Sequence, residues 1–168
     1  VQNYSGLTLS GVTLDGSNLE GSGRYVLSNN QGTSYIKENS EIIAKSGDFA
    51  LDSCKYGNYT RPTVTVTDTK ITGKIEITGG ALTLGNNAEV NGQIRVGENK
   101  DGGATGGTLT VNAGAKINNP GNYAIAVFGK NTVTINDGEI NGIIGRQYPS
   151  AVGARHDERC FLSTSTKM

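Results

Sequence analysis

The sequence predicts an all-β fold, a right-handed parallel β-helix of about five to six coils, either complete or as a piece of a longer helix. Two observations lead to this prediction. Short runs of the chain alternate apolar residues with threonine or charged residues, which is the pattern of strands that bury one face. Similar runs recur in units along the chain, and many of the 25 glycines lie between them. A unit of this size cannot bury its apolar face alone, so the units are expected to stack as coils.

The repeat is clearest in the middle of the chain. Each unit starts with an apolar–Thr–apolar strand, passes through a polar turn to a charged and then an apolar residue, and closes with a second alternating pair. Asn and Gly between these runs supply tight or left-handed corners. The clear units are 63–77, 81–96, 108–127 and 132–144, and looser copies lie at 7–14 and 35–51.

Two aligned positions set the expected register of the coils. One holds an apolar anchor, and the other holds the charged residue just before it. The anchors are Ile42, Ile71, Val90, Ile117 and Ile140, and the charged residues are Glu41, Lys70, Glu89, Lys116 and Glu139. Stacking in sequence order alternates the sign of the charge at every step, and opposite charges on neighbouring strands attract. We expect this ladder to disfavour slipped registers.

Segments 6–16, 80–92 and 107–119 share a pattern of apolar, Thr, Asn and Gly positions. In this pattern they resemble the repeats of right-handed parallel β-helix proteins of the pectin-lyase-like family, above all its large bacterial surface and adhesin-type members. That family holds polysaccharide-cleaving enzymes as well as non-catalytic adhesion and stalk modules, so the resemblance implies architecture more than activity. Unequal unit lengths also favour the right-handed form over a left-handed helix with a strict hexapeptide period. The expected domains are a β-helix over 4–146 and a non-repeating tail over 147–168, disordered or divergent.

Composition restricts the partners. Lys plus Arg and Asp plus Glu both number 15, so the net charge is zero. A nucleic-acid partner or an anionic membrane surface would require a basic excess. No apolar run approaches the ~20 residues of a membrane-spanning helix. The chain begins at Val1 rather than Met, and we expect a mature or excised piece of a secreted or cell-surface protein.

Two long connectors, 52–62 and 97–107, are expected to leave the same edge of the stacked coils. Loops held by a rigid scaffold often carry function. Tyrosine rings suit the apolar face of a sugar, and amide, acidic and basic groups suit its hydroxyls. The candidates for binding a glycan or a host or cell-surface partner are Tyr56, Tyr59, Arg61, Glu98, Asn99, Lys100 and Asp101. The alternative is that the glycine-rich connector is flexible and that the tyrosines cap the edge of the core.

The strands offer little for catalysis. Outward charged positions include Lys74, Glu76 and Arg95, but no single strand carries a pair of Asp residues. Asp68 and Asp137 fall at turns, where Asp and Asn commonly bond to their own backbone. We therefore expect a structural role for these two carboxylates and no catalytic residues.

The expected function is that of a non-catalytic, extracellular module of a bacterial surface protein, serving adhesion, acting as a stalk or contacting glycans. The alternative is a pectate-lyase-like, carbohydrate-active enzyme, or a fragment of one. No cofactor is expected, because Glu98 and Asp101 offer calcium only loop ligands without a fixed spacing. A minor alternative is ice binding, because outward Thr pairs align in units that resemble the face of some ice-binding solenoids. Thr is, however, generally favoured on exposed strands.

Overall fold

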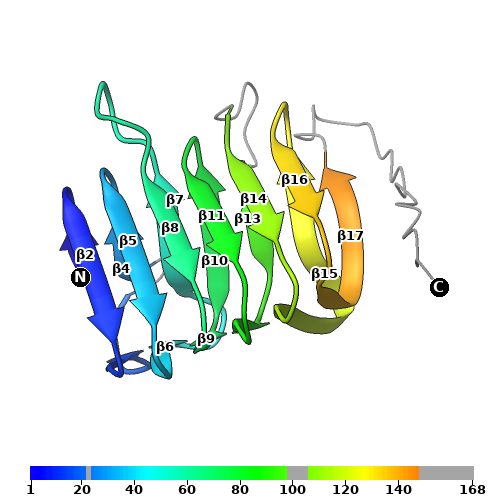
Figure 1. Cartoon of the computed structure of the whole chain (residues 1–168), viewed down its shortest axis with the longest axis horizontal. Coiled ribbons are helices and arrows are strands. Elements are labelled where there is room, and N and C mark those ends of the chain that lie inside the picture. The colour runs from blue at the N-terminus through cyan, green and yellow to red at the C-terminus, as the bar shows by residue number, and fades with distance from the viewer. Residues whose placement is uncertain (22–23, 98–105, 148–168) are drawn as a thin grey trace.

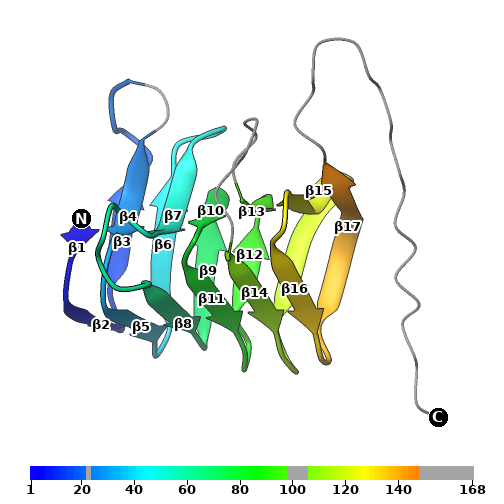
Figure 2. The same cartoon turned by 90° about the horizontal axis from the view of Figure 1, so that it is seen from above.

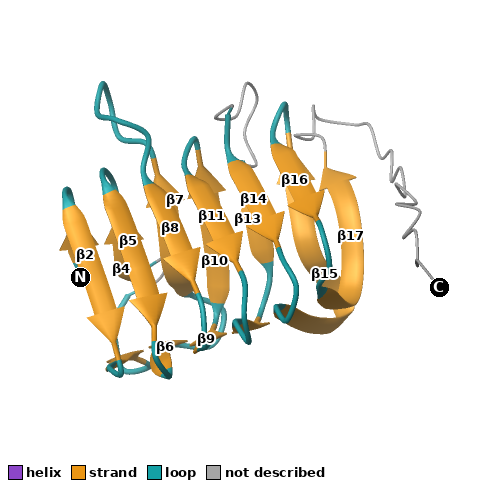
Figure 3. Cartoon of the chain, viewed as in Figure 1, coloured by secondary structure: helices purple, strands orange, loops and turns teal. Residues whose placement is uncertain are grey.

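The computed structural model describes residues 1–21, 24–97 and 106–147. Within these ranges the chain forms 17 strands and no helix. The strands pair in parallel and lie in a row of coils stacked along one axis (Figures 1 and 3). The predicted all-β parallel β-helix is therefore confirmed.

Each coil contributes to three faces, which we number in chain order (Figures 1 and 2). Face 1 consists of β2 (Gly6–Ser10), β5 (Thr33–Lys37), β8 (Thr63–Val66), β11 (Ala81–Leu84), β14 (Thr108–Val111) and β16 (Thr132–Ile135). Face 2 consists of β3 (Thr13–Gly16), β6 (Ser40–Ala44), β9 (Thr69–Thr72), β12 (Glu89–Asn91) and the first parts of β15 (Lys116–Phe128) and β17 (Glu139–Gln147). Face 3 consists of β1 (Gln2–Asn3), β4 (Tyr25–Asn29), β7 (Phe49–Cys54), β10 (Lys74–Thr78), β13 (Ile94–Val96) and the second parts of β15 and β17.

The chain passes from face 1 to face 2 to face 3 and then returns to face 1 one coil further along the axis. The hydrogen-bonded sheet of face 1 is 6-stranded, and the described residues therefore form six coils. Faces 2 and 3 belong to one continuous sheet, because β15 and β17 run through the corner between them.

The register agrees with the charge ladder. The paired residues along face 2 are Glu41 with Lys70, Lys70 with Glu89, Glu89 with Lys116, and Lys116 with Glu139. At the last step the Lys116 Nζ atom lies 3.0 Å from Glu139 Oε2. The predicted alternation of sign is therefore present between neighbouring coils.

The core is a thin column of aliphatic side chains enclosed by the three faces. The anchors Ile42, Ile71, Val90 and Ile117 are completely buried, and Ile140 in the last coil packs against them while partly buried. Burying an aliphatic side chain of this size contributes about 2 kcal/mol relative to exposing it. Because each coil adds such an anchor, stability accumulates along the axis.

A polar ladder takes the place of aliphatic side chains where face 3 turns into face 1 in the first coils. Asn3 Nδ2 donates hydrogen bonds to Asn29 Oδ1 at 2.6 Å and to Ser34 Oγ at 3.1 Å. Asn29 Nδ2 donates in turn to the Thr63 carbonyl at 3.2 Å. In the described residues no buried side-chain nitrogen or oxygen lacks a partner. An unpaired buried polar group costs roughly 1–3 kcal/mol. Removing one member of this ladder would leave its partner without a hydrogen bond, so the polar residues of this corner stabilise the fold only together.

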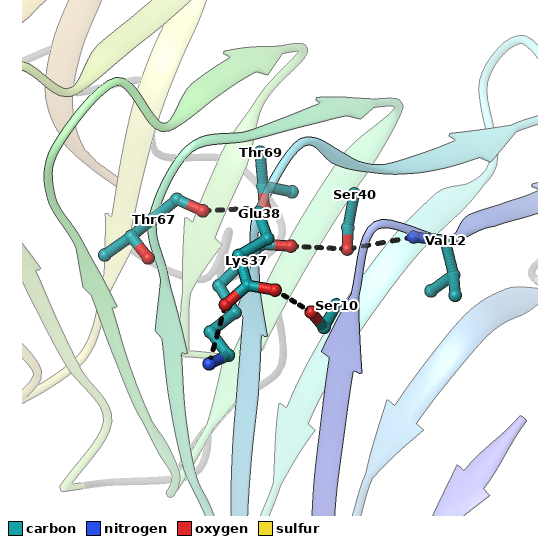
Figure 4. Close-up of polar contacts among 7 residues, drawn as sticks. All are labelled: Ser10, Val12, Lys37, Glu38, Ser40, Thr67 and Thr69. Atoms are coloured by element: carbon teal, nitrogen blue, oxygen red, sulfur yellow. Dashed lines mark hydrogen bonds and ion pairs between the residues drawn. The ribbon is translucent and has the colours of Figure 1, made fainter.

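The corner between faces 1 and 2 is closed by short side chains that bond to backbone (Figure 4). Ser40 Oγ donates to the Lys37 carbonyl at 2.7 Å and accepts from the Val12 amide at 3.3 Å. In the next coil Thr69 Oγ1 donates to the Thr67 carbonyl at 2.8 Å. Asp68 adopts a positive φ of 46° here, in agreement with its expected turn role.

Candidate functional site

Three exposed tyrosines form a contiguous cluster, which we call the tyrosine edge: Tyr4, Tyr56 and Tyr59. Their exposed fractions are 47%, 63% and 46%, respectively. The rings of Tyr56 and Tyr59 stack with centroids 6.3 Å apart and an interplanar angle of 29°. Tyr4 meets Tyr59 edge to face, with centroids 6.1 Å apart at 75°. The predicted pair of tyrosines is thus extended by a third ring.

The tyrosine edge joins the first coil to the third. Tyr56 and Tyr59 lie in the connector between β7 and β8, which projects beyond the stack at the corner between faces 3 and 1 (Figure 1). The connector is anchored at its start, where the Lys55 amide donates to the Thr78 carbonyl at 2.8 Å. Its tip is held by a bond from the Tyr59 amide to the Tyr56 carbonyl at 3.2 Å.

Tyr4 is placed by the buried polar ladder beside it. The neighbouring Asn3 is buried, and its Oδ1 atom accepts a hydrogen bond from the Ser5 amide at 3.1 Å. This turn leaves the intervening Tyr4 ring on the outside. The sequence gives no periodic signal for Tyr4, because its contact with Tyr59 depends on how a connector from another coil folds.

Arg61 does not join the tyrosine edge. Its Nη2 atom donates to the Gly80 carbonyl at 3.0 Å and to Thr108 Oγ1 at 2.6 Å. Both acceptors belong to coils on the far side of the connector from Tyr4. Arg61 therefore links neighbouring coils at the corner between faces 3 and 1, and its guanidinium is hydrogen-bonded within the protein.

The second predicted connector leaves the same corner, because it runs from the end of β13 on face 3 to the start of β14 on face 1. Its candidate residues Glu98, Asn99, Lys100 and Asp101 lie outside the described residues. Their part in binding stays a prediction.

A second candidate group of side chains lies on face 3, where the outward positions of successive coils are Ser28, Asp52, Glu76 and Arg95. We call this group the face-3 strip. A search for acidic pairs within single strands misses it, because Asp52 and Glu76 belong to different strands. The signal in the sequence is the alignment of Leu51 with Ile75, the inward residues of the last strand of each unit. This alignment places Asp52 next to Glu76.

Two side chains of the face-3 strip, Glu76 and Arg95, form a network with the neighbouring Tyr25 and Phe49. Arg95 Nη1 lies 3.4 Å from Glu76 Oε1, and the Tyr25 hydroxyl donates to Glu76 Oε2 at 2.6 Å. Tyr25 stacks on Phe49 with centroids 4.9 Å apart. The Arg95 guanidinium carbon lies 5.9 Å from the centre of the Phe49 ring, within cation–π range. Glu76 is thereby held by one cation and one hydroxyl.

Burial changes the proton affinity of two groups on face 3, Asp52 and Tyr25. It raises the pKa of Asp52 to about 6, and the nearby Glu76 carboxylate adds to the rise, while hydrogen bonds from Ser28 and Asn29 oppose it. Burial also raises the pKa of Tyr25, and the hydrogen bond to Glu76 adds to that shift. Near neutral pH the strip therefore places a carboxyl group that titrates there beside a second carboxylate, an arrangement suited to acid–base chemistry.

Access to this acid pair is limited. Asp52 is only 6% exposed. A hollow of about 450 Å³ at the N-terminal end is lined by Tyr25, Leu14 and Arg24 among others, but by neither Asp52 nor Glu76. The tyrosine edge is the more accessible of the two groups.

Metal ligands do not gather in the described ranges, where no three His, Cys, Asp or Glu side chains are close enough together to hold a metal ion. In the same ranges no helix has the length and apolarity to cross a membrane. Comparisons with protein-family models, with curated proteins and with solved structures find no match to this chain.

Proposed function

We propose that this chain is a non-catalytic, extracellular module of a bacterial surface protein of the pectin-lyase-like type, and that it contacts glycans through the tyrosine edge. The observation that carries the proposal is a cluster of three exposed rings, in which Tyr59 contacts both Tyr4 and Tyr56. Large exposed aromatic groups are uncommon on a surface without a partner, and an apolar ring with a hydroxyl suits a sugar.

The scaffold supports this assignment by holding the rings in place before a ligand arrives. One ring is fixed beside a buried polar ladder and the other two by a connector bonded at its start and tip. Rings that are already ordered lose little conformational entropy on binding. The balanced net charge leaves no electrostatic preference for polyanions over neutral glycans.

The test is a glycan-array screen of the protein and of the double variant Tyr56→Ala/Tyr59→Ala. The protein is expected to bind a set of neutral oligosaccharides, and the double variant is expected to lose them. Tyr35→Ala is the matched control, because Tyr35 is also 50% exposed but lies on β5, away from the connector. Equal array profiles for the protein and the double variant would contradict the proposal.

A second candidate function, cleavage of a glycan, is favoured by the juxtaposition of Asp52 and Glu76. Glycosidic bonds are commonly cleaved by two carboxyl groups, one donating a proton and the other acting as base or nucleophile. Its test is the release of reducing or unsaturated ends from a panel of polysaccharides. If the protein releases such ends and both Asp52→Asn and Glu76→Gln abolish the release, cleavage is established. If the unmodified protein releases none, the cleavage function is rejected and glycan binding remains the proposed function.

A further inference from the structure

Face 1 is regular along its whole length. All five pairings between its neighbouring strands run without a register shift. Face 3, in contrast, has a shift between Lys74 and Ile75, and the β15–β17 pair has further shifts. The strands of face 1 lie side by side along the axis (Figure 1), and their pairing places equivalent residues of successive coils in straight columns.

Two outward columns run the length of face 1. The first column is Gly6, Thr33, Thr63, Ala81, Thr108 and Thr132, and the second is Thr8, Tyr35, Thr65, Thr83, Thr110 and Thr134. Nine of these twelve positions are threonine, and none is charged. The columns thus form an almost uniform array of methyl and hydroxyl groups.

The threonines are not explained by strand propensity alone. If Thr were present only because it is favoured on exposed strands, the other faces would carry it equally. The outward column of face 2 instead holds the alternating charges from Glu41 to Glu139, and face 3 holds Asp52, Glu76 and Arg95. The chain therefore places charged residues in outward columns of faces 2 and 3 and none in these two columns of face 1, where the charged Lys37 lies beside them at the end of β5.

The array is also ordered at the level of side chains. Thr is β-branched and stiff at χ1, and strands stacked roughly 4.8 Å apart repeat the same rotamer environment. Within a strand the two columns are separated by about 7 Å, the rise of two residues. Thr63 Oγ1 donates to Thr33 Oγ1 at 3.0 Å, so the hydroxyls of the second and third coils are aligned along the first column.

From this placement we propose that face 1 binds ice. A two-dimensional lattice of fixed hydroxyls supplies donors and acceptors at regular intervals, and the methyl groups between them leave the intervening waters bonded to one another. Charged side chains would instead keep their own hydration shells, whose waters do not match the ice lattice. A crystalline glycan is the less favoured ligand for this face, because aromatic platforms are absent from its two columns apart from Tyr35.

The interruptions of the array make the proposal sharper. Tyr35 breaks the second column in the second coil. Gly6 and Ala81 break the first column, and the Arg61 guanidinium occupies the hydroxyl of Thr108 in the same column. The uninterrupted patch is the second column from Thr65 to Thr134. Replacing Tyr35 by Thr should therefore extend the continuous threonine patch and raise the ice-binding activity.

The test measures partition of the protein into slowly growing ice, together with thermal hysteresis. The protein should enter ice, the double variant Thr83→Lys/Thr110→Lys should fall to the level of a non-binding protein, and Tyr35→Thr should exceed the unmodified protein. Thr13→Lys is the matched control, since it adds the same side chain on face 2 beside Glu41. Circular dichroism and melting temperature establish that each variant is folded.

Three results would overturn the proposal. They are exclusion of the unmodified protein from ice, full activity of the folded double variant, and binding to insoluble cellulose or chitin that the same two lysines abolish without any ice activity. Tyr56→Ala/Tyr59→Ala should retain the ice activity, so the ice proposal and the glycan proposal can fail separately.

Discussion

At the scale of single residues, the burial of Asp52 has a measurable consequence for stability. Its pKa rises from 3.8 to about 6 on folding, so the folded protein binds this proton more tightly than the unfolded chain does. The stability that Asp52 contributes is therefore present in full below about pH 4 and is lost as the pH rises through about 6. A shift of this size corresponds to about 3 kcal/mol.

The corresponding prediction is that the free energy of unfolding falls between pH 4 and pH 7, and that Asp52→Asn removes most of this slope. The amide keeps an oxygen for the bond from the Asn29 amide but does not ionise. Urea unfolding at several pH values measures the effect. The exposed Asp137→Asn is the control and should keep the slope; an unchanged slope in Asp52→Asn would show that this carboxyl is not the cause.

Arg61 gives a second prediction, because its contacts are with the protein. Arg61→Ala removes bonds to the Gly80 carbonyl and to Thr108 Oγ1, and should lower stability by about 1 kcal/mol. Glycan binding at the tyrosine edge should be unchanged. Thermal melting and the array screen measure the two effects, and a variant that melts normally but no longer binds would place Arg61 in the binding site.

The residues of the candidate sites differ in how far the sequence predicts them. Tyr56 and Tyr59 stand out because a long connector carries them. Glu76 and Arg95 stand out as outward charges, but the proximity of Asp52 follows only from the pairing of strands in different coils. The role of Tyr4 could not be predicted, because it depends on the conformation of a connector that belongs to the third coil.

At the scale of the elements, the charge ladder on face 2 fixes how neighbouring strands align. Glu89 lies between Lys70 and Lys116, so every neighbour of this charge is opposite in sign. A one-residue slip would turn the inward anchors outward and would also remove this alternation. The ladder thus acts together with the core to select one register.

We predict that Glu89→Lys destabilises the protein by about 0.5–1 kcal/mol at low salt, because it places three like charges in a row. The loss should shrink in high salt, where exposed charges are screened. Glu89→Gln is the control and should cost less at low salt. Denaturant unfolding at two ionic strengths provides the measurement, and equal losses for both variants at low salt would exclude a role for the ladder.

The elements themselves were largely predictable from the sequence. Alternation located the face 1 strands, and the anchors from Ile42 to Ile140 located those of face 2. The strand that runs continuously through Lys116–Phe128 was not predicted, because its central Pro and Gly read as a corner. The chain does turn there, with Gly121 at a positive φ of 75°, but strand pairing continues on both sides of the turn and so joins faces 2 and 3 into one sheet.

At the scale of the whole molecule, the three faces have separate chemistries on one rigid scaffold. Face 1 carries the two threonine-rich columns, face 2 carries the ladder, and face 3 carries the acid pair. The tyrosine edge lies at the corner between faces 3 and 1. This division is possible because each coil repeats the same three strands, so a residue type placed at one position of the unit becomes a stripe along the axis.

Contact between the tyrosine rings and a glycan is tested most directly by saturation-transfer NMR. The aromatic protons of the protein are irradiated in the presence of the neutral oligosaccharides that bind on the array. Transfer should reach the C–H protons on one face of the sugar, persist in Tyr35→Ala and disappear in Tyr4→Ala/Tyr56→Ala/Tyr59→Ala. Transfer that survives in the folded triple variant, or that is absent from the unmodified protein, would contradict the central claim.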